Sequence, residues 1–322
     1  MGEIRVLISG TCPPHLNSNY VLLREITRGF QQLDGHLGRL DVQLVPLDKL
    51  LPTVSDWRPT YTLLVGGLAL ETIPLAMVSH RCKLHGSRLA FWSLEDPYEF
   101  DCVLQQGHWF DLICTSDHAS SCFYPGDWRV EHLPLASPER PMPATGELLR
   151  ASARWMFCGV PFVNRLRWIA ALVGACPQGL LIGPGWPAYA PPTAVHQGRI
   201  APGVLHQLYA VQPLTLYLGR DQDLANSIGV IPSTPGPRLF ECAGGGGRQL
   251  VCGSGLEAAL YYEPELEMLP AATLGEAIGW LEWAEHHPRE LLAIGERAWR
   301  RTQAEHLYRH RASRLLTWLR EL

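Results

Sequence analysis

Short apolar runs recur through the first half of this chain, and segments long enough for a helix separate them. The runs occupy residues 4–9, 42–46, 61–66, 89–93, 111–115 and 130–133. Strands that are apolar on both sides need cover on both faces, which parallel strands receive from the helices that connect them. The pattern therefore predicts an α/β fold with a parallel sheet wound on both faces.

The same alternation begins again in the second half. We expect strands at residues 155–158, 180–182, 215–218, 249–252 and 260–262, and helices at 162–173, 237–243, 274–285 and from 288 almost to 322. Residues 137–146, SPERPMPATG, contain three prolines, and they cannot continue a helix or a central strand. We predict two doubly wound domains, residues 1–145 and 146–300, followed by a C-terminal helix, 301–322, that packs across them.

Composition narrows the functional classes. The chain has 322 residues, more than one hydrophobic core usually supports, and its net charge of -4 gives no general attraction to nucleic acids. Its nine cysteines include no C-x-x-C pair, which is typical of reduced thiols in the cytoplasm. No apolar run reaches the ~18 residues of a membrane helix. We expect a cytoplasmic protein without a membrane span, and its oligomeric state stays open.

Several familiar catalytic signatures are missing from the sequence. It has no G-x-G-x-x-G dinucleotide fingerprint, no phosphate-binding P-loop and no G-x-S-x-G nucleophile turn. The thirteen histidines form no H-E-x-x-H or H-x-H pattern, so we expect no metal site. These observations oppose nicotinamide dehydrogenases, P-loop enzymes and serine hydrolases.

Residues 235–247 carry a more specific signal. Arg238 and Glu241 are three residues apart in an expected helix, so both side chains lie on one face and could address one ligand. The glycine run 244–247 follows, and glycine allows a close approach of backbone because it has no side chain. Such a surface suits a phosphorylated sugar or a nucleotide. The alternative is a surface ion pair followed by a flexible loop.

Five segments together resemble a known family. They are WSLEDPYEFD at 92–101, FDLICTSD at 110–117, HLPLA at 132–136, PRLFECAG at 237–244 and HLYRHR at 306–311. In this order they resemble GT-B glycosyltransferases of the CgeB-like family, which is related to spore-maturation proteins and to the glycosyl transferases of group 1. Each segment is weak alone, but the ordered set extends over most of the chain.

The resemblance implies two Rossmann-like domains that face each other across a cleft. It implies a hexosyl- or related transferase, which moves a sugar from a nucleoside-diphosphate sugar to a hydroxyl or amine acceptor. The second domain would hold the donor, the first would hold the acceptor, and neither a metal nor a cofactor would be needed. Group 1 enzymes often carry two glutamates with seven residues between them, the second of which binds the donor ribose. Glu241 matches the second position, whereas Ser233 stands at the first.

The chemistry of transfer suggests roles for individual residues. Negative charge develops on the leaving diphosphate, and arginines or helix N-termini can stabilise it. An acceptor hydroxyl must lose a proton, which an acid beyond a buried strand could accept. The donor-binding candidates are Gly10, Asn164, Arg165, Gly185, Trp186, Arg238, Leu239 and Glu241. The catalytic candidates are Glu95, Asp96 and His118.

Each assignment has a structural alternative. Arg165 could be a solvated side chain near a helix end, Asp96 could cap a turn, and Trp186 could belong to a core. Two other functions also stay open. One is a sugar-nucleotide-binding or surface-assembly protein with little turnover, and the other is a sugar-nucleotide epimerase or hydrolase. The donor sugar, the base, the acceptor and the stereochemistry are not determined by the sequence.

Overall fold

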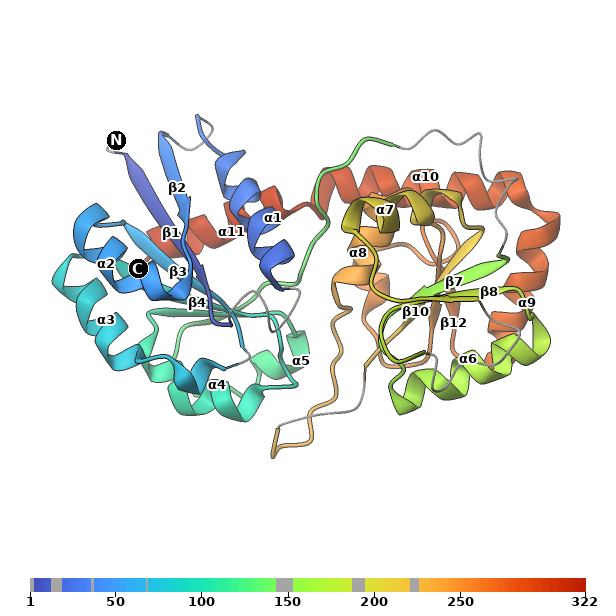
Figure 1. Cartoon of the computed structure of the whole chain (residues 1–322), viewed down its shortest axis with the longest axis horizontal. Helices are drawn as coiled ribbons and strands as arrows, with labels where there is room; N and C mark the ends of the chain where they lie inside the picture. The colour runs from blue at the N-terminus through green and yellow to red at the C-terminus, as the bar shows by residue number, and fades with distance from the viewer. Residues whose placement is uncertain are drawn as a thin grey trace. The chain divides into compact units, whose positions relative to one another are not determined.

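The computed structural model divides the chain into two compact units, which are described separately here (Figure 1). It describes residues 3–12, 19–35, 38–67, 69–142, 153–186, 195–220 and 226–322. The first unit comprises Met1–Leu135, Asp223–Thr234 and Leu307–Leu322, and the second comprises Ala136–Gln222 and Pro235–His306. The predicted domain boundary at residues 145 and 146 lies outside the described residues. It stays a prediction.

The first unit contains a six-stranded parallel sheet in the order β2-β1-β3-β4-β5-β6. Its strands are β1 (Ile4–Gly10), β2 (Leu40–Leu44), β3 (Tyr61–Gly66), β4 (Arg88–Ser93), β5 (Leu112–Thr115) and β6 (Val130–His132). Its helices are α1 (Asn19–Gln31), α2 (Leu47–Trp57), α3 (Leu75–Leu84), α4 (Phe100–Gln106), α5 (His118–Ser121) and α11 (Tyr308–Arg320). The predicted parallel sheet is confirmed.

Helices cover both faces of this sheet. Leu7 of β1 belongs to a core shared with α2, α3 and α4, whereas α1 packs against α11 on the other side (Figure 1). The contact between α1 and α11 is close, because a Cβ atom at Gly29 would lie 2.6 Å from the backbone of Tyr308. The C-terminal helix is therefore an integral part of the first unit.

The second unit contains a six-stranded parallel sheet in the order β12-β11-β10-β7-β8-β9. Its strands are β7 (Trp155–Cys158), β8 (Gly179–Ile182), β9 (Val195–Gln197), β10 (Leu214–Leu218), β11 (Gln249–Cys252) and β12 (Leu269–Ala271). Its helices are α6 (Val163–Ala175), α7 (Pro202–Val211), α8 (Pro237–Gly244), α9 (Leu274–His286) and α10 (Pro288–Glu305). Helix α9 begins with a cap, in which the Glu276 N–H donates to the Thr273 hydroxyl (3.2 Å).

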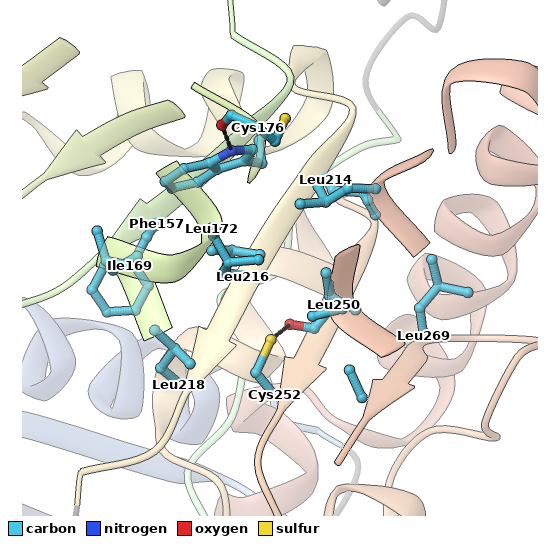
Figure 2. Packing of buried hydrophobic residues seen from close by; sticks show 14 of the residues in the cluster. Phe157, Ile169, Leu172, Cys176, Leu214, Leu216, Leu218, Leu250, Cys252 and Leu269 are labelled. Carbon is cyan, nitrogen blue, oxygen red and sulfur yellow. Dashed lines mark hydrogen bonds between the residues drawn. The ribbon is translucent and has the colours of Figure 1, made fainter. Parts of the chain in front are cut away.

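Alternate side chains along these strands enter different cores. Figure 2 shows one of them, in which Phe157, Leu216 and Leu250 pack with Ile169 and Leu172 of α6. The Trp155 indole N–H donates to the Cys176 carbonyl within this core (2.9 Å). The next residue, Met156, faces the opposite side and packs with α7 and α8. Period-two alternation with apolar residues on both sides explains why the sequence runs are continuous.

Two sequence predictions are wrong. Residues 260–262 are not a strand, because Ala258–Leu260 form a 3-10 helix and the Tyr261 and Tyr262 rings pack around His306. The long terminal helix is broken into α10 and α11. Leu307 adopts an extended conformation (φ -92, ψ 158) between them. No Gly or Pro marks this break, so the amphipathic period alone does not reveal it.

All nine cysteines are free thiols. This agrees with the absence of C-x-x-C pairs from the sequence. In the described part of the chain, no helix combines the length and the apolar character that a membrane crossing requires.

Candidate functional site

The sheet of the second unit changes its winding direction between β7 and β10. Strands β8 and β9 extend it on one side, and β11 and β12 extend it on the other. Ligands of doubly wound sheets bind beyond the carboxyl ends of the strands at such a switch point. The segments after β7 and β10 lead into α6 and α8, which carry five of the candidates: Asn164, Arg165, Arg238, Leu239 and Glu241.

Arg165 lies in the first turn of α6 and donates hydrogen bonds to backbone carbonyls. Its Nε donates to Gly219 (3.0 Å), Nη1 to Val160 (3.2 Å) and Nη2 to Leu218 (3.2 Å). The neighbouring Asn164 amide also donates to Gly219 (3.0 Å). The first turn of α6 is therefore tied to the carboxyl end of β10.

Arg238 and Glu241 form an ion pair one turn apart on α8. Their side chains are 46% and 18% exposed, whereas the other side of the helix enters the core. The pKa of the Arg238 guanidinium is raised above its usual range, chiefly by the negative charge of the Glu241 carboxylate. This pair presents one positive group and one hydroxyl acceptor on a single helix face.

Cys158 is the last residue of β7, and the charges of the second unit act on its thiol. Burial raises the pKa of its thiol, and the nearby charges of Arg238 and Glu241 and, more weakly, of Arg165 act on it as well. Arg165 lies beside the end of β7, since a Cβ atom at Gly159 would be 3.1 Å from its Nη1.

The other candidates of the second unit lie in different environments. The Trp186 side chain is fully buried, its ring packs edge-on against Phe157, and its indole N–H donates to the Gly159 carbonyl (2.8 Å). Leu239 is fully buried in the core beneath α8. Gly185 has a φ of 88, a left-handed conformation that favours glycine. A buried Trp186 offers no ring face for a base to stack on.

Gly10 lies in the first unit, whereas the other seven donor-binding candidates lie in the second. It ends β1, at the switch point between β1 and β3 of the first sheet. Glu95 lies beside this point, since a Cβ atom at Gly67 would be 3.0 Å from the Glu95 Cβ. Burial raises the pKa of the Cys12 thiol, and the Glu95 carboxylate raises it further. Glu95 is partly exposed and follows β4.

Asp96 differs from its neighbour because it is only 4% exposed. Its carboxyl accepts hydrogen bonds from the Ser93 hydroxyl (2.7 Å) and the Tyr124 hydroxyl (2.6 Å). Burial raises the pKa of the Asp96 carboxyl above its ordinary value, although hydrogen bonds from Thr115, Tyr124 and Ser93 act in the opposite direction. The carboxyl is enclosed by its own unit, so Glu95 is the more accessible acid of the pair.

The raised pKa predicts how stability depends on pH. A carboxyl whose pKa is higher in the folded state stabilises the fold at pH values below its ordinary pKa of 3.8. This stabilisation is lost as the pH rises through the pKa of the folded state. Asp96→Asn keeps the size and removes the titration. Relative to wild type, we expect the variant to gain stability as pH rises above about 4. Urea unfolding from pH 4 to 8 measures this, and a pH-independent difference would contradict it.

The Asp117 carboxylate accepts five hydrogen bonds, the longest from the Ser233 hydroxyl (3.5 Å), and the residue is only 1% exposed. One carboxylate oxygen accepts from the backbone N–H groups of Ser233 (2.8 Å) and Thr234 (2.9 Å). The other accepts from the Ser120 N–H (2.9 Å) and hydroxyl (2.8 Å), which caps α5. Within the first unit, this carboxylate therefore anchors residues 226–234 to the start of α5.

His118 begins α5, and its side chain is exposed. Its ring lies 5.2 Å from the ring of His132, and its backbone N–H donates to the Thr234 hydroxyl (2.9 Å). The Ser233 hydroxyl accepts from the Ala119 N–H (3.2 Å). Ser233 thus helps to hold residues 226–234 against the start of α5.

Sequence reasoning missed two residues of structural importance at these edges. Asp117 was visible as an acid after a strand, but its partners Ser233 and Thr234 are 116 and 117 positions away. The hydroxyl of Tyr217, on β10, accepts from the Gly236 N–H at the start of α8 (2.6 Å). An aromatic residue in a strand carries no signal of such a bond. Among the described residues, no three His, Cys, Asp or Glu side chains are grouped so that they could hold a metal ion.

Part of the chain matches a known protein family, and nearly all of it matches solved structures. Residues 164–317 match a family model described as glycosyl transferase-like. No curated protein matches the sequence. The protein HepE of Anabaena, solved in complex with UDP, has a TM-score of 0.64 at 11% identity, covering 99% of this chain and 100% of that one.

Two further structures are similar. The apo form of the lipopolysaccharide outer core galactosyltransferase WaaB has a TM-score of 0.56 at 11% identity, covering 99% of this chain and 100% of that one. A Listeria monocytogenes protein assigned as a UDP-N-acetylglucosamine 2-epimerase has a TM-score of 0.53 at 10% identity, covering 98% and 95%. Identities this low show the fold alone. The predicted GT-B fold with two Rossmann-like units is confirmed, and residues 164–317 are similar to a glycosyl transferase-like family.

Proposed function

We propose that this protein is a glycosyltransferase that moves a sugar from a nucleoside-diphosphate sugar to a hydroxyl or amine acceptor. The glycosyl transferase-like match over residues 164–317 supports sugar transfer. The observation that carries the proposal is the ion pair of Arg238 and Glu241 on α8, the helix that follows β10 at the switch point of the second sheet. A donor needs both a cation for its phosphates and an acceptor for its ribose hydroxyls.

In this proposal, Glu241 binds the ribose of the donor and Arg238 binds its diphosphate. A carboxylate has about four lone-pair sites, so Glu241 can keep its bond to Arg238 and still accept from ribose hydroxyls. The Arg238 side chain is 46% exposed, so a diphosphate can approach it from solvent. We propose that this cation and the N-terminus of α8 stabilise the leaving diphosphate without a metal.

The first unit would provide the acceptor side. Glu95 is the proposed base, since it is partly exposed beside the switch point of the first sheet. His118 is also exposed and stays a second candidate. Asp96 is enclosed by Ser93 and Tyr124, which favours a structural role within the edge that carries Glu95.

The donor nucleotide, the family and the cellular location are each supported by fewer observations. HepE was solved with UDP, and a structure of MnaA from S. aureus with UDP has a TM-score of 0.54 at 8% identity. Uridine diphosphate is therefore the first donor nucleotide to test. Membership of the CgeB-like family rests on the five ordered sequence segments. A cytoplasmic location is supported by the nine free cysteines.

One observation favours a binding protein with little turnover as the second candidate. Ser233, at the position of the family's first glutamate, is engaged in holding residues 226–234 against the start of α5 through Asp117 and Ala119. A serine supplies no negative charge to a developing sugar cation. A protein that retains Glu241 and Arg238 but lacks this carboxylate could bind a sugar nucleotide without transferring it.

Product analysis distinguishes these functions. Purified protein is incubated with UDP-sugars, with and without a cell-extract acceptor pool, and the released UDP and free sugar are quantified. A transferase releases UDP in proportion to added acceptor, by more than about tenfold over donor alone. Release of UDP with equimolar free sugar would indicate a hydrolase, and a changed sugar still attached to UDP would indicate an epimerase. Binding without any product would favour the second candidate.

A further inference from the structure

Arg165 was expected to bind phosphate, but its surroundings indicate another task. Three nitrogens of its guanidinium, Nε, Nη1 and Nη2, donate to three different carbonyls at 3.0 to 3.2 Å. These carbonyls belong to Val160, in the segment after β7, and to Leu218 and Gly219, at the end of β10. One side chain thus ties together the ends of the two strands that form the switch point.

Aromatic rings hold the guanidinium plane in this position. Its central carbon lies 4.9 Å from the ring centre of Phe162 and 5.5 Å from that of Phe157. Stacking on ring faces and in-plane donation to carbonyls use both recognition modes of arginine at once. Lysine has neither the plane nor the fork and could not replace these contacts.

The same end of β10 also determines where α8 begins. Tyr217 immediately precedes Leu218, and its hydroxyl accepts from the Gly236 N–H (2.6 Å). Gly236 is the residue before the first turn of α8, which carries Arg238 and Glu241. A hydrogen-bonded path therefore runs from Arg165 through the end of β10 to the helix with the proposed donor contacts.

We propose that Arg165 is a positioning residue, which fixes the ends of β7 and β10 and thereby the face of α8, and that Arg238 supplies the cation for the diphosphate. This inference rests on the proposed function, because it assigns a task within the donor site. For a phosphate to recruit Arg165, the guanidinium would first have to leave its three carbonyls. Arg238, in contrast, could contact the phosphate and keep its ion pair with Glu241.

The first test needs no ligand. Hydrogen exchange followed by mass spectrometry is compared for wild type, Arg165→Lys and the control Arg167→Lys, which changes an exposed arginine on the same helix. Arg165→Lys should exchange faster at residues 160–162, 218–220 and 236–241, whereas Arg167→Lys should match wild type. Tyr217→Phe should accelerate only the start of α8. Unchanged exchange at 236–241 in Arg165→Lys would overturn the positioning role, whatever the protein binds.

The second test separates charge from position. UDP and uridine affinities are measured by calorimetry and competition for wild type, Arg165→Lys, Arg165→Ala and Arg238→Ala. A positioning residue predicts that both Arg165 variants lose affinity for the two ligands by the same factor, about tenfold. Arg238→Ala should lose affinity for UDP alone. Wild-type UDP affinity in Arg165→Lys, or a loss confined to UDP in Arg165→Ala, would make Arg165 a phosphate ligand. Failure of wild type to bind UDP would instead count against the proposed function.

Discussion

Glu241→Gln is expected to weaken UDP binding by about 1 to 3 kcal/mol, roughly a 5- to 150-fold rise in the dissociation constant. The substitution keeps the size of the side chain. It removes the negative charge of the carboxylate, which would accept hydrogen bonds from the ribose hydroxyls. Glu241 lies on the face of α8 beside Arg238, near the switch point of the second sheet. The loss should appear for uridine as well as for UDP, because both carry the ribose. Calorimetry with both ligands measures it.

Glu296→Gln is a matched control for this variant. Glu296 pairs with Arg300 on α10 of the same unit, and both side chains are more exposed than Glu241. Breaking an exposed pair changes stability by less than about 1 kcal/mol. The control should bind UDP like wild type. If Glu241→Gln also binds both ligands like wild type, Glu241 has no part in donor recognition.

Asp117→Ala is expected to destabilise the first unit by about 3 kcal/mol or more. It would leave the buried donors of Thr234 and Ser120 and the partly buried donor of Ser233 without their acceptor, and each unpaired buried group costs about 1 to 3 kcal/mol. The anchored segment leads directly into α8, so its release should also lower UDP affinity. Urea unfolding and hydrogen exchange at residues 226–234 measure the two effects.

Asp101→Ala tests whether the burial of Asp117 determines how strongly residues 226–234 are anchored. The Asp101 carboxylate holds the same segment by accepting from the Ser227 N–H (2.9 and 2.8 Å), but this contact is exposed. Water can replace an exposed partner, so the expected loss is below about 1 kcal/mol. Equal destabilisation by the two substitutions would show that burial of Asp117 does not set the strength of the anchor.

The sequence predicted the central strands because burial on both faces makes them continuously apolar. β3, β7 and β11 coincide with the predicted runs 61–66, 155–158 and 249–252, and other central strands differ by a residue or two. The edge strands β9 and β12 have three residues each, too short for a periodic signal. The break at Leu307 was missed because it depends on tertiary contacts, such as the bond from the His306 ring to the Tyr261 carbonyl (3.0 Å).

The site was partly predictable from local chemistry. The spacing of Arg238 and Glu241 predicted a shared helix face, which the structure has as an ion pair. Strand order was not visible in the sequence, so it could not show that Arg165 and Arg238 follow the two strands of one switch point. Burial was not visible either, since Asp96 and Trp186 become enclosed only through partners distant in sequence.

Titration of the wild-type protein with UDP, with Arg238→Ala measured beside it, tests the central claim most directly. The account predicts that UDP binds with a dissociation constant below about 1 mM, which corresponds to roughly 4 kcal/mol of binding free energy. Arg238→Ala should weaken UDP selectively over uridine. If wild type binds neither UDP nor any other common nucleoside diphosphate at millimolar concentration, the switch point of the second unit is not a donor site.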